Sequence, residues 1–352
     1  MRNKEFRFPV TVLIGSEISN LRKIAHGKHI DPGFRVKYGT TAAVSTILTA
    51  FSKIDSLINA RKIKNFEITE PPVFIIAFWR SGTTLLHNLL CQNPDFGFVS
   101  TFQTVFPNHT LSNQWWLKFV ASPFLPEKRP ADDVKFEWEN PQEEEMALGN
   151  MQEFSFYNFM YFPKDFKDYV AKGLMLDKMS EKELKKWKED YLRLIKIALL
   201  NTGGKRLISK NPPNAFRIKQ LLEMFPEAKF INISRKPEEV VFSFKRFITE
   251  VLKGTALQET SEEMINKRTR ELYDLYTEKY HADKLLIPEG NLIEIDYHEF
   301  VKDKHKYIKR IYDELGLEGY EKALPRMNRY LEDTKDFKPW NFRSKKGKKK
   351  ED

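Results

Sequence analysis

Residues 73–84 read VFIIAFWRSGTT, and this stretch decides the fold class. Its first six residues form a continuous apolar run, which is typical of a parallel strand buried on both faces. After Trp79 comes the polar loop Arg80 to Thr84, and Leu85 to Leu90 then favours a helix. A strand, a tight loop and a helix in direct succession predict an α/β unit with an anion site at the loop.

The chemistry of this loop suits a phosphate or phosphosulfate group. Gly82 permits a close backbone turn, and the N–H groups at the start of the following helix attract anions. Ser81, Thr83 and Thr84 add hydroxyl donors, and Arg80 adds a forked cation. The loop lacks the lysine that follows glycine in a Walker A motif, which disfavours a nucleoside triphosphate. An ordinary capped helix start is the simpler alternative.

Further strands are predicted at residues 206–209 (RLIS), 229–234 (KFINIS) and 291–297 (NLIEIDY). Helices are expected between them, including one that opens on a capping box at Ser180 and Glu183 and another over 308–315. Strands that alternate with helices predict a central parallel sheet flanked by helices on both faces. Ligands of such sheets bind at the carboxyl ends of the strands, where both the 80–84 loop and Arg235 lie.

Arg235 marks a second candidate anion site. It ends the 229–234 strand, and Ser243 lies eight residues later, about two turns into the next helix. Arg235 can hold a phosphate whose oxygens Ser243 also reaches, although a surface ion pair and a small packing residue would explain the two as well. Two anion sites at neighbouring strand ends indicate a ligand with separated phosphates.

An amphipathic helix is predicted ahead of the first strand, because apolar residues recur there at helical spacing. Its stripe comprises Val44, Ile47, Leu48, Phe51, Ile54 and Ile58. We expect this stripe to pack on the core rather than on a membrane. The uncharged stretch near 39–52 is too short to span a bilayer, so no transmembrane segment is predicted.

Composition fits one large globular domain in a reducing compartment. The chain has 352 residues, 41% of them hydrophobic, and the single Cys91 excludes an internal disulfide, so we expect a cytoplasmic protein. The net charge is +10, of which the tail Arg343–Asp352 carries +4, and the remainder is ordinary for a protein that binds no nucleic acid. Neither the one Cys nor the seven His show the spacing of metal ligands, so no metal is expected.

Three motifs in this order resemble the family of sulfotransferases that use 3′-phosphoadenosine-5′-phosphosulfate (PAPS). The 80–84 loop resembles the family's 5′-phosphosulfate loop, and Arg235-x-Pro237-x-x-Val240-x-x-Ser243 resembles its 3′-phosphate motif. Residues 295–300 (IDYHEF) and 311–317 (IYDELGL) resemble its last strand and helix. Residues 140–145 (NPQEEE) are similar to an acidic stretch in the bacterial branch with a large central insertion.

The resemblance implies a P-loop-like sulfotransferase fold with helical insertions. It also implies PAPS as donor, adenosine 3′,5′-bisphosphate as product and no metal. On this basis residues 1–340 form one domain: 65–100 carry the phosphosulfate loop, 101–200 an aromatic-rich lid with helices, and 205–320 the 3′-phosphate unit. Residues 341–352 form a basic disordered tail.

The catalytic groups are less settled, because this chain departs from the family where the base is expected. Cytosolic members have a lysine where Arg80 stands, and their catalytic His follows a Lys where this chain has Lys210-Asn211. Lys210 is our candidate for stabilising the leaving phosphate. The remaining candidates for the general base are Glu143, Glu144 and His109.

The aromatic residues of 101–175 predict a hydrophobic acceptor for the sulfuryl group. Such a segment is a plausible lid lined by apolar rings, although dense aromatic residues also build cores. We therefore expect a small-molecule hydroxyl acceptor such as a sterol or a lipid-like alcohol. Sulfation of a carbohydrate or a protein tyrosine, and a P-loop kinase-like enzyme, are the alternatives. The sequence does not indicate an oligomeric state.

Overall fold

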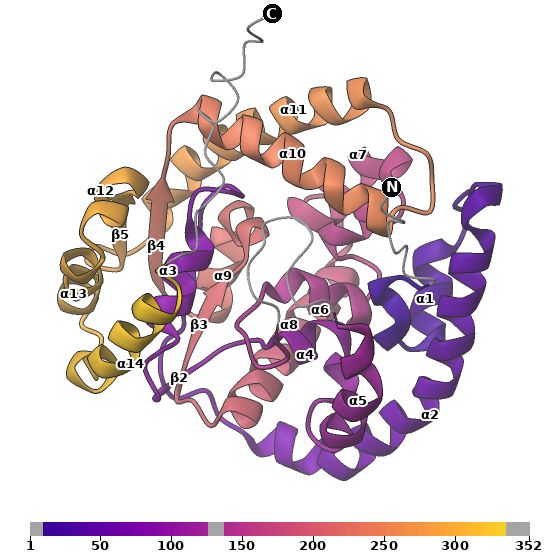
Figure 1. The fold of residues 1–352 in the computed structure, drawn as a ribbon, viewed down its shortest axis with the longest axis horizontal. Coiled ribbons are helices and arrows are strands. Elements are labelled where there is room, and N and C mark those ends of the chain that lie inside the picture. The colour runs from indigo at the N-terminus through magenta and orange to yellow at the C-terminus, as the bar shows by residue number, and fades with distance from the viewer. Residues whose placement is uncertain (1–9, 126–136, 336–352) are drawn as a thin grey trace, which may run out of the picture.

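A five-stranded parallel sheet is the centre of the computed structural model, which describes residues 10–125 and 137–335. The strands are β1 Val73–Ile75, β2 Phe96–Gly97, β3 Arg206–Lys210, β4 Lys229–Ser234 and β5 Leu292–Asp296, in the order β2-β3-β1-β4-β5. All four pairings are parallel, so the predicted sheet is confirmed (Figure 1). The two-residue β2 was not predicted, and β1 covers only the first half of the apolar run.

Helices surround the sheet. They are α1 Ile18–Ala25, α2 Arg35–Asn65, α3 Thr83–Leu90, α4 Thr101–Val105, α5 Gln114–Ala121, α6 Glu144–Met151, α7 Phe166–Asp168, α8 Glu181–Thr202, α9 Ile218–Met224, α10 Pro237–Thr255, α11 Glu262–Asp283, α12 Tyr297–Lys302, α13 Lys304–Glu314 and α14 Tyr320–Asp333. The predicted capping box is confirmed, since the Ser180 and Glu183 side chains each accept from the other's backbone N–H at the start of α8. Pro237 opens α10 at the position that needs no N–H donor.

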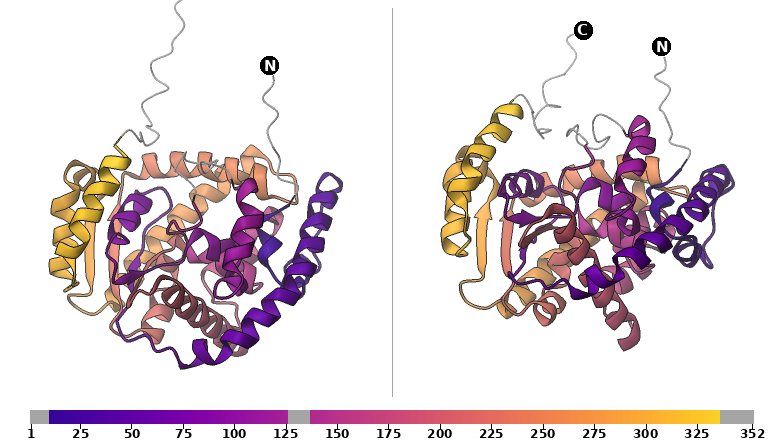
Figure 2. Two further views of the ribbon diagram at one scale, coloured as in Figure 1. Left: turned by 60° about the horizontal axis from the view of Figure 1, so that its bottom comes forward. Right: turned by 90° about the horizontal axis from the view of Figure 1, so that it is seen from below.

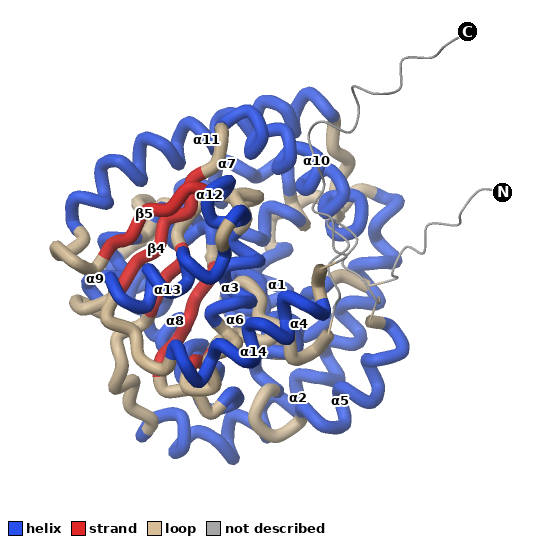
Figure 3. The backbone as a smooth tube through the Cα atoms, turned by 60° about the vertical axis from the view of Figure 1, so that its left-hand side comes forward, coloured by secondary structure: helices blue, strands red, loops and turns tan. Residues whose placement is uncertain are grey.

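Two apolar cores cover the two faces of the sheet, and successive residues of the 73–78 run alternate between them. Phe74, Ile76 and Phe78 belong to the larger core, which includes residues of α8 to α11. Val73, Ile75 and Ala77 belong to the second core, formed with α3, α13 and α14. The sheet is therefore buried between helical layers, as Figure 3 shows for the strands in red.

The strand register brings the polar loops together at one edge of the sheet. Ile75 of β1 lies opposite Lys210, the last residue of β3, and also opposite Ile231 of β4. The loop after β1, the end of β3 and the residue after β4 therefore share the carboxyl edge.

The aromatic-rich segment folds into short helical turns, and much of it is core. Phe156 and Phe159 lie 4.7 Å apart between ring centroids, and both rings are almost fully buried with Phe166 and Tyr169. Tyr157 and Trp138 are also buried. Residues 126–136 of this segment, and the predicted tail at 341–352, lie outside the described residues.

The prediction for α2 is wrong in one respect: most of the apolar stripe does not pack on the core. Leu48 is buried, but Ile47, Ile54 and Ile58 are 64%, 51% and 66% exposed. The face that packs inward is largely polar, because Thr41, Ser45, Ser52, Asp55 and Asn59 are buried there. Periodicity identified the helix correctly and assigned the wrong face to the interior.

The segment Pro32–Asn65, which contains α2, is long and apolar enough to be a candidate membrane span on length and composition alone. Only 28% of its most apolar window is buried. The polar face nevertheless bonds to the rest of the fold: the Thr11 N–H donates to Thr41 Oγ1 at 2.9 Å, and the Ser112 N–H to Asp55 Oδ2 at 2.8 Å. These bonds hold the helix against the protein.

Candidate active site

The 80–84 loop adopts a backbone conformation that requires its glycine. Gly82 has φ of +94°, in the left-handed region that side chains disfavour, and it forms the N-cap of α3. A Cβ atom at this position would lie 2.3 Å from the ring of Tyr297. The loop therefore lies against the Tyr297 ring. The first N–H groups of α3 have no acceptor within the helix.

The structure brings the two candidate anion sites together. The Arg80 Nε–H donates to Ser243 Oγ at 3.3 Å, and Arg235 Nη1–H donates to the Arg80 carbonyl oxygen at 3.3 Å. The Arg235 guanidinium lies 4.5 Å from the centroid of the Tyr297 ring, and Glu239 accepts from its Nε–H at 2.8 Å. The guanidinium of Arg80 in the loop, that of Arg235 directly after β4 and the hydroxyl of Ser243 on α10 thus lie close together.

Lys210 and Glu143 form a second polar group at the same edge of the sheet. The Lys210 Nζ lies 2.6 Å from Glu143 Oε1, with the lysine side chain 2% exposed and the glutamate 18%. The Tyr157 hydroxyl donates to Glu143 Oε2, and it accepts from the Trp79 indole N–H at 2.7 Å. Because Trp79 precedes Arg80, this chain of hydrogen bonds joins the carboxylate to the loop.

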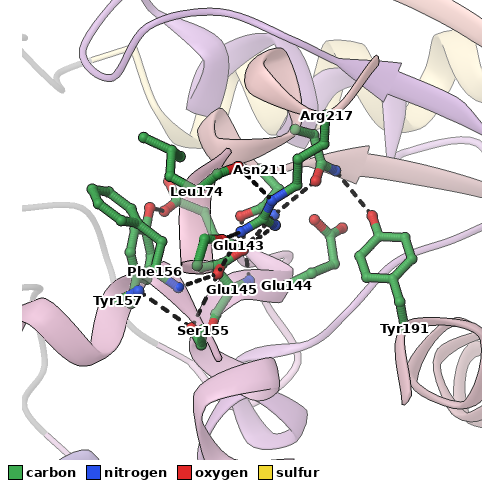
Figure 4. Close-up of polar contacts among 12 residues, drawn as sticks. Glu143, Glu144, Glu145, Ser155, Phe156, Tyr157, Leu174, Tyr191, Asn211 and Arg217 are labelled. Atoms are coloured by element: carbon green, nitrogen blue, oxygen red, sulfur yellow. Dashed lines mark hydrogen bonds and ion pairs between the residues drawn. The ribbon is translucent and has the colours of Figure 1, made fainter. Parts of the chain in front are cut away.

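Glu145 holds the acidic stretch in place through a fully buried ion pair. Arg217 donates from Nη1 and Nη2 to its two oxygens at 2.7 and 3.0 Å, as Figure 4 shows. Asn211 bonds the same residue twice, from its Nδ2 to Oε2 and from the Glu145 N–H to its Oδ1, each at 3.2 Å. Asn211, at the position of the family's usual histidine, therefore helps to hold Glu145 in place.

Glu144 points into the interior rather than toward the loop. Its side chain is fully buried, and Ser209 Oγ–H donates to its Oε2 at 3.0 Å. Burial raises the pKa of Glu144 to about 8, against smaller opposing effects of the Ser209 hydrogen bond and the Lys210 cation. Glu144 therefore stays protonated at neutral pH.

His109 lies apart from this group. It is 1% exposed on the short 3-10 helix Pro107–His109 and packs edge-on against Phe106 at 6.3 Å. Burial lowers the pKa of His109 to about 4, against a smaller opposing effect of the Glu17 charge. The structure thus groups His109 with the N-terminal region and places Glu143 beside Lys210.

Sequence reasoning missed three side chains of the site. Tyr157 and Arg217 are far in sequence from the groups that they contact, and no motif marks them. Tyr297 was quoted within the 295–300 stretch without a role, although its position directly after β5 marks it as a residue of the carboxyl edge. Within residues 10–125 and 137–335, no cluster of three or more His, Cys, Asp or Glu side chains is arranged to hold a metal.

The Sulfotransferase family profile matches residues 71–322, which is most of the chain. The protein therefore belongs to the sulfotransferase family, and it is an enzyme that transfers sulfate. This membership agrees with the parallel sheet and the polar loops at its carboxyl edge. It favours sulfuryl transfer over the kinase-like alternative.

Two relatives are the omega-hydroxy-beta-dihydromenaquinone-9 sulfotransferases Stf3 of Mycobacterium bovis and Mycobacterium tuberculosis. Each is 32% identical over 307 residues, covering 87% of this chain and 77% of the relative. The crystal structure of sulfotransferase STF1 from M. tuberculosis matches with a TM-score of 0.68 and 17% identity, covering 90% of this chain and 88% of the other. The crystal structure of sulfotransferase STF9 from Mycobacterium avium matches with a TM-score of 0.67 and 15% identity, covering 88% of this chain and 79% of the other. These structural matches confirm the sulfotransferase fold.

The buried Glu144 predicts a specific pH dependence of stability. In the unfolded chain this carboxyl ionises near its ordinary pKa of 4.5, whereas in the fold it keeps its proton up to about 8. The contribution of the Glu144 carboxyl to the free energy of unfolding is therefore complete below pH 4.5. It is lost as pH rises toward 8, by up to about 1.4 kcal/mol per pH unit. Glu144→Gln mimics the neutral acid and cannot ionise. As pH rises, the wild type should therefore lose free energy of unfolding relative to the Glu144→Gln variant.

Urea unfolding at pH 5, 6.5 and 8 measures this difference. Glu223→Gln, at a partly exposed carboxylate paired with Lys188, is the matched control and should show little change between these pH values. A difference between Glu144→Gln and wild type that stays constant from pH 5 to pH 8 contradicts the assignment.

Proposed function

We propose that the protein transfers the sulfuryl group of PAPS to a hydroxyl of a hydrophobic, lipid-like acceptor. The observation that carries the donor half is the convergence of Arg80, Arg235 and Ser243 beside a glycine-containing loop at a helix N-terminus. Two cations at neighbouring strand ends suit a nucleotide with separated 5′ and 3′ phosphates. A Cβ atom at Gly82 would collide with the Tyr297 ring, so only glycine lets the loop lie this close to that side chain.

In this proposal each group of the loop has a defined task. The N–H groups of the 81–84 turn, with the hydroxyls of Ser81, Thr83 and Thr84, hold the 5′-phosphosulfate, and Arg235 with Ser243 holds the 3′-phosphate. When bound, the donor supplies an activated sulfuryl group and leaves as a phosphate anion. Arg80 lies between the two sites and stabilises this anion.

Lys210 and Glu143 are placed to complete the chemistry. Lys210 Nζ lies 2.6 Å from Glu143 Oε1, so the two side chains are held together at the carboxyl edge of the sheet. We infer that Lys210 turns from Glu143 to the leaving oxygen, which frees Glu143 Oε1 to accept the proton of the acceptor hydroxyl. Tyr157 keeps Glu143 oriented through its bond to Oε2.

The proposed acceptor follows from the relatives. The name of Stf3 gives its acceptor as omega-hydroxy-beta-dihydromenaquinone-9, a hydroxylated menaquinone lipid. At 32% identity this supports the class of acceptor for this chain rather than the individual molecule. The single Cys91 fits a reducing compartment, so we place the reaction in the cytoplasm.

Arg235→Ala should weaken the binding of adenosine 3′,5′-bisphosphate roughly 10- to 100-fold, because a charged donor to phosphate contributes about 1.5–3 kcal/mol. Isothermal titration calorimetry measures the change. Arg326→Ala removes an exposed arginine on α14 and should bind like the wild type. Unchanged affinity in Arg235→Ala rules out the 3′-phosphate assignment.

Glu143→Gln keeps the shape of the side chain and removes its basicity. The variant should lower kcat by roughly 10²–10⁴-fold while the affinity for the bisphosphate stays near that of the wild type. His109→Gln should be mild in the same assay. If Glu143→Gln keeps near-full turnover and His109→Gln abolishes it, the base is His109 and the assignment is wrong.

Transfer of radiolabelled sulfate to a panel of acceptors tests the remaining half of the proposal. The panel contains a prenylated quinol with a terminal hydroxyl, a sterol, a simple phenol, a tyrosine peptide and glycans. We expect the hydroxylated lipids to give the highest kcat/KM because the relatives that are 32% identical are named for a hydroxylated menaquinone acceptor. Activity confined to glycans or the peptide would sink the lipid assignment.

A further inference from the structure

Exposed apolar side chains gather on one part of the molecule. Thirteen large hydrophobic residues are exposed in the described part of the chain, and ten of them lie on α2, on α5 or in the 3-10 turn Ser122–Phe124 that follows α5. Six are on α2: Val36, Ile47, Phe51, Ile54, Leu57 and Ile58. Single exposed apolar residues scattered over a surface are normal, whereas a group of them in one place indicates an interaction surface.

The two helices form one continuous surface, here named the α2–α5 face. The rings of Phe51 and Trp116 lie 5.0 Å apart, and the Asn113 side chain donates to the Phe51 carbonyl oxygen at 3.2 Å. Trp115 and Phe119 of α5 are 78% and 83% exposed. Figures 1 and 2 show α2 along the outer edge of the molecule, at the end opposite α13 and α14.

The helix is built so that this apolar stripe cannot turn inward. Its opposite side is held by buried polar contacts: Ser45 Oγ–H donates to the Ser16 carbonyl oxygen, and Asp55 accepts from the Ser112 N–H. The Asn59 Nδ2–H also donates to Asp55 Oδ1 at 2.9 Å. The polar side is thus satisfied by protein, and the apolar side is left for a partner outside the fold.

Charge identifies the partner. The α2 segment contains six basic residues, Arg35, Lys37, Lys53, Arg61, Lys62 and Lys64, and its one acidic residue, Asp55, is 4% exposed. With Lys118 on α5, the two helices carry a net of six positive charges. Lys53 and Lys118 form ion pairs with Glu17 and Glu139, so the attraction for an anionic surface rests on the basic residues at the two ends of α2. The C-terminal tail Arg343–Asp352 carries four more, so all other residues together are neutral in a chain of net charge +10.

We propose that the α2–α5 face docks on the surface of an anionic lipid bilayer. Apolar and aromatic side chains enter the boundary between headgroups and acyl chains, and the basic residues at both ends of α2 attract the anionic headgroups. The helix lies along the surface rather than across it, because its buried polar side stays bonded to the protein. A symmetric contact between two copies would instead place the same basic helices against each other.

Flotation of the purified full-length protein with lipid vesicles tests this proposal. One set of vesicles contains phosphatidylcholine and phosphatidylglycerol in equal amounts, and the other contains phosphatidylcholine alone. We expect most of the protein to float with the anionic vesicles and little with the neutral ones, and we expect high salt to reduce the binding. Protein that stays unbound in the presence of anionic vesicles overturns the proposal.

Substitutions at exposed positions separate the face from general stickiness. Leu57→Asp, at a residue 80% exposed, should weaken vesicle binding at least about tenfold, because it adds an anion and removes an anchor. Leu285→Asp is the matched control: that residue is 81% exposed on the short helix Lys284–Leu286, outside the face, and its variant should float like the wild type. Both variants should melt at the wild-type temperature, since neither position is in the core.

Light scattering without lipid distinguishes the other occupant of this face. The proposal expects the same mass for the wild type and Leu57→Asp. A wild-type dimer that becomes a monomer in Leu57→Asp assigns the face to a second copy of the chain and overturns membrane docking. Equal vesicle binding by Leu57→Asp and the wild type overturns it as well.

Discussion

The buried ion pair between Glu145 and Arg217 fixes the arrangement on which the site depends. Both side chains are fully buried, and two charges in such a place are tolerated only because every oxygen of the carboxylate has partners. Arg217 also donates to the carbonyl oxygens of Gly173 and Leu174, so the pair joins α6, the start of α9 and the aromatic segment. Removing one partner of such a pair typically costs about 3–5 kcal/mol.

Anchoring Glu145 decides what the two residues before it face. Glu145 and Glu144 are in the first turn of α6, and Glu143 is its N-cap. Consecutive side chains at a helix start point in different directions, so Glu144 and Glu143 face other surroundings than Glu145. Glu144 enters the interior against Ser209 and keeps its proton, whereas Glu143, at the N-cap of α6, forms an ion pair with Lys210. Three consecutive glutamates thus have three different environments, and of the three only Glu143 is partly exposed.

The strands and the glycine-centred turn before α3 could be predicted from sequence because their signals are local. An uninterrupted apolar run followed by a glycine-centred turn constrains the backbone within a dozen residues. The roles of Glu143, Tyr157 and Arg217 depend instead on contacts between residues 14 to 72 positions apart, which no spacing rule encodes. β2 was missed because two residues, Phe96 and Gly97, carry no periodic pattern.

The α2 helix shows a different limit of periodicity. A hydrophobic stripe establishes that a helix has two unlike faces, but it leaves open which face meets the protein. Here buried hydrogen bonds to Ser45, Asp55 and Asn59 decide the orientation, and their partners lie in segments far from α2 in sequence. The exposed stripe loses the stabilisation of roughly 25 cal/mol per Å² that burial would provide, unless a partner supplies it. The exposed apolar stripe of α2 therefore indicates a partner outside the fold, because its polar face is already bonded to the protein.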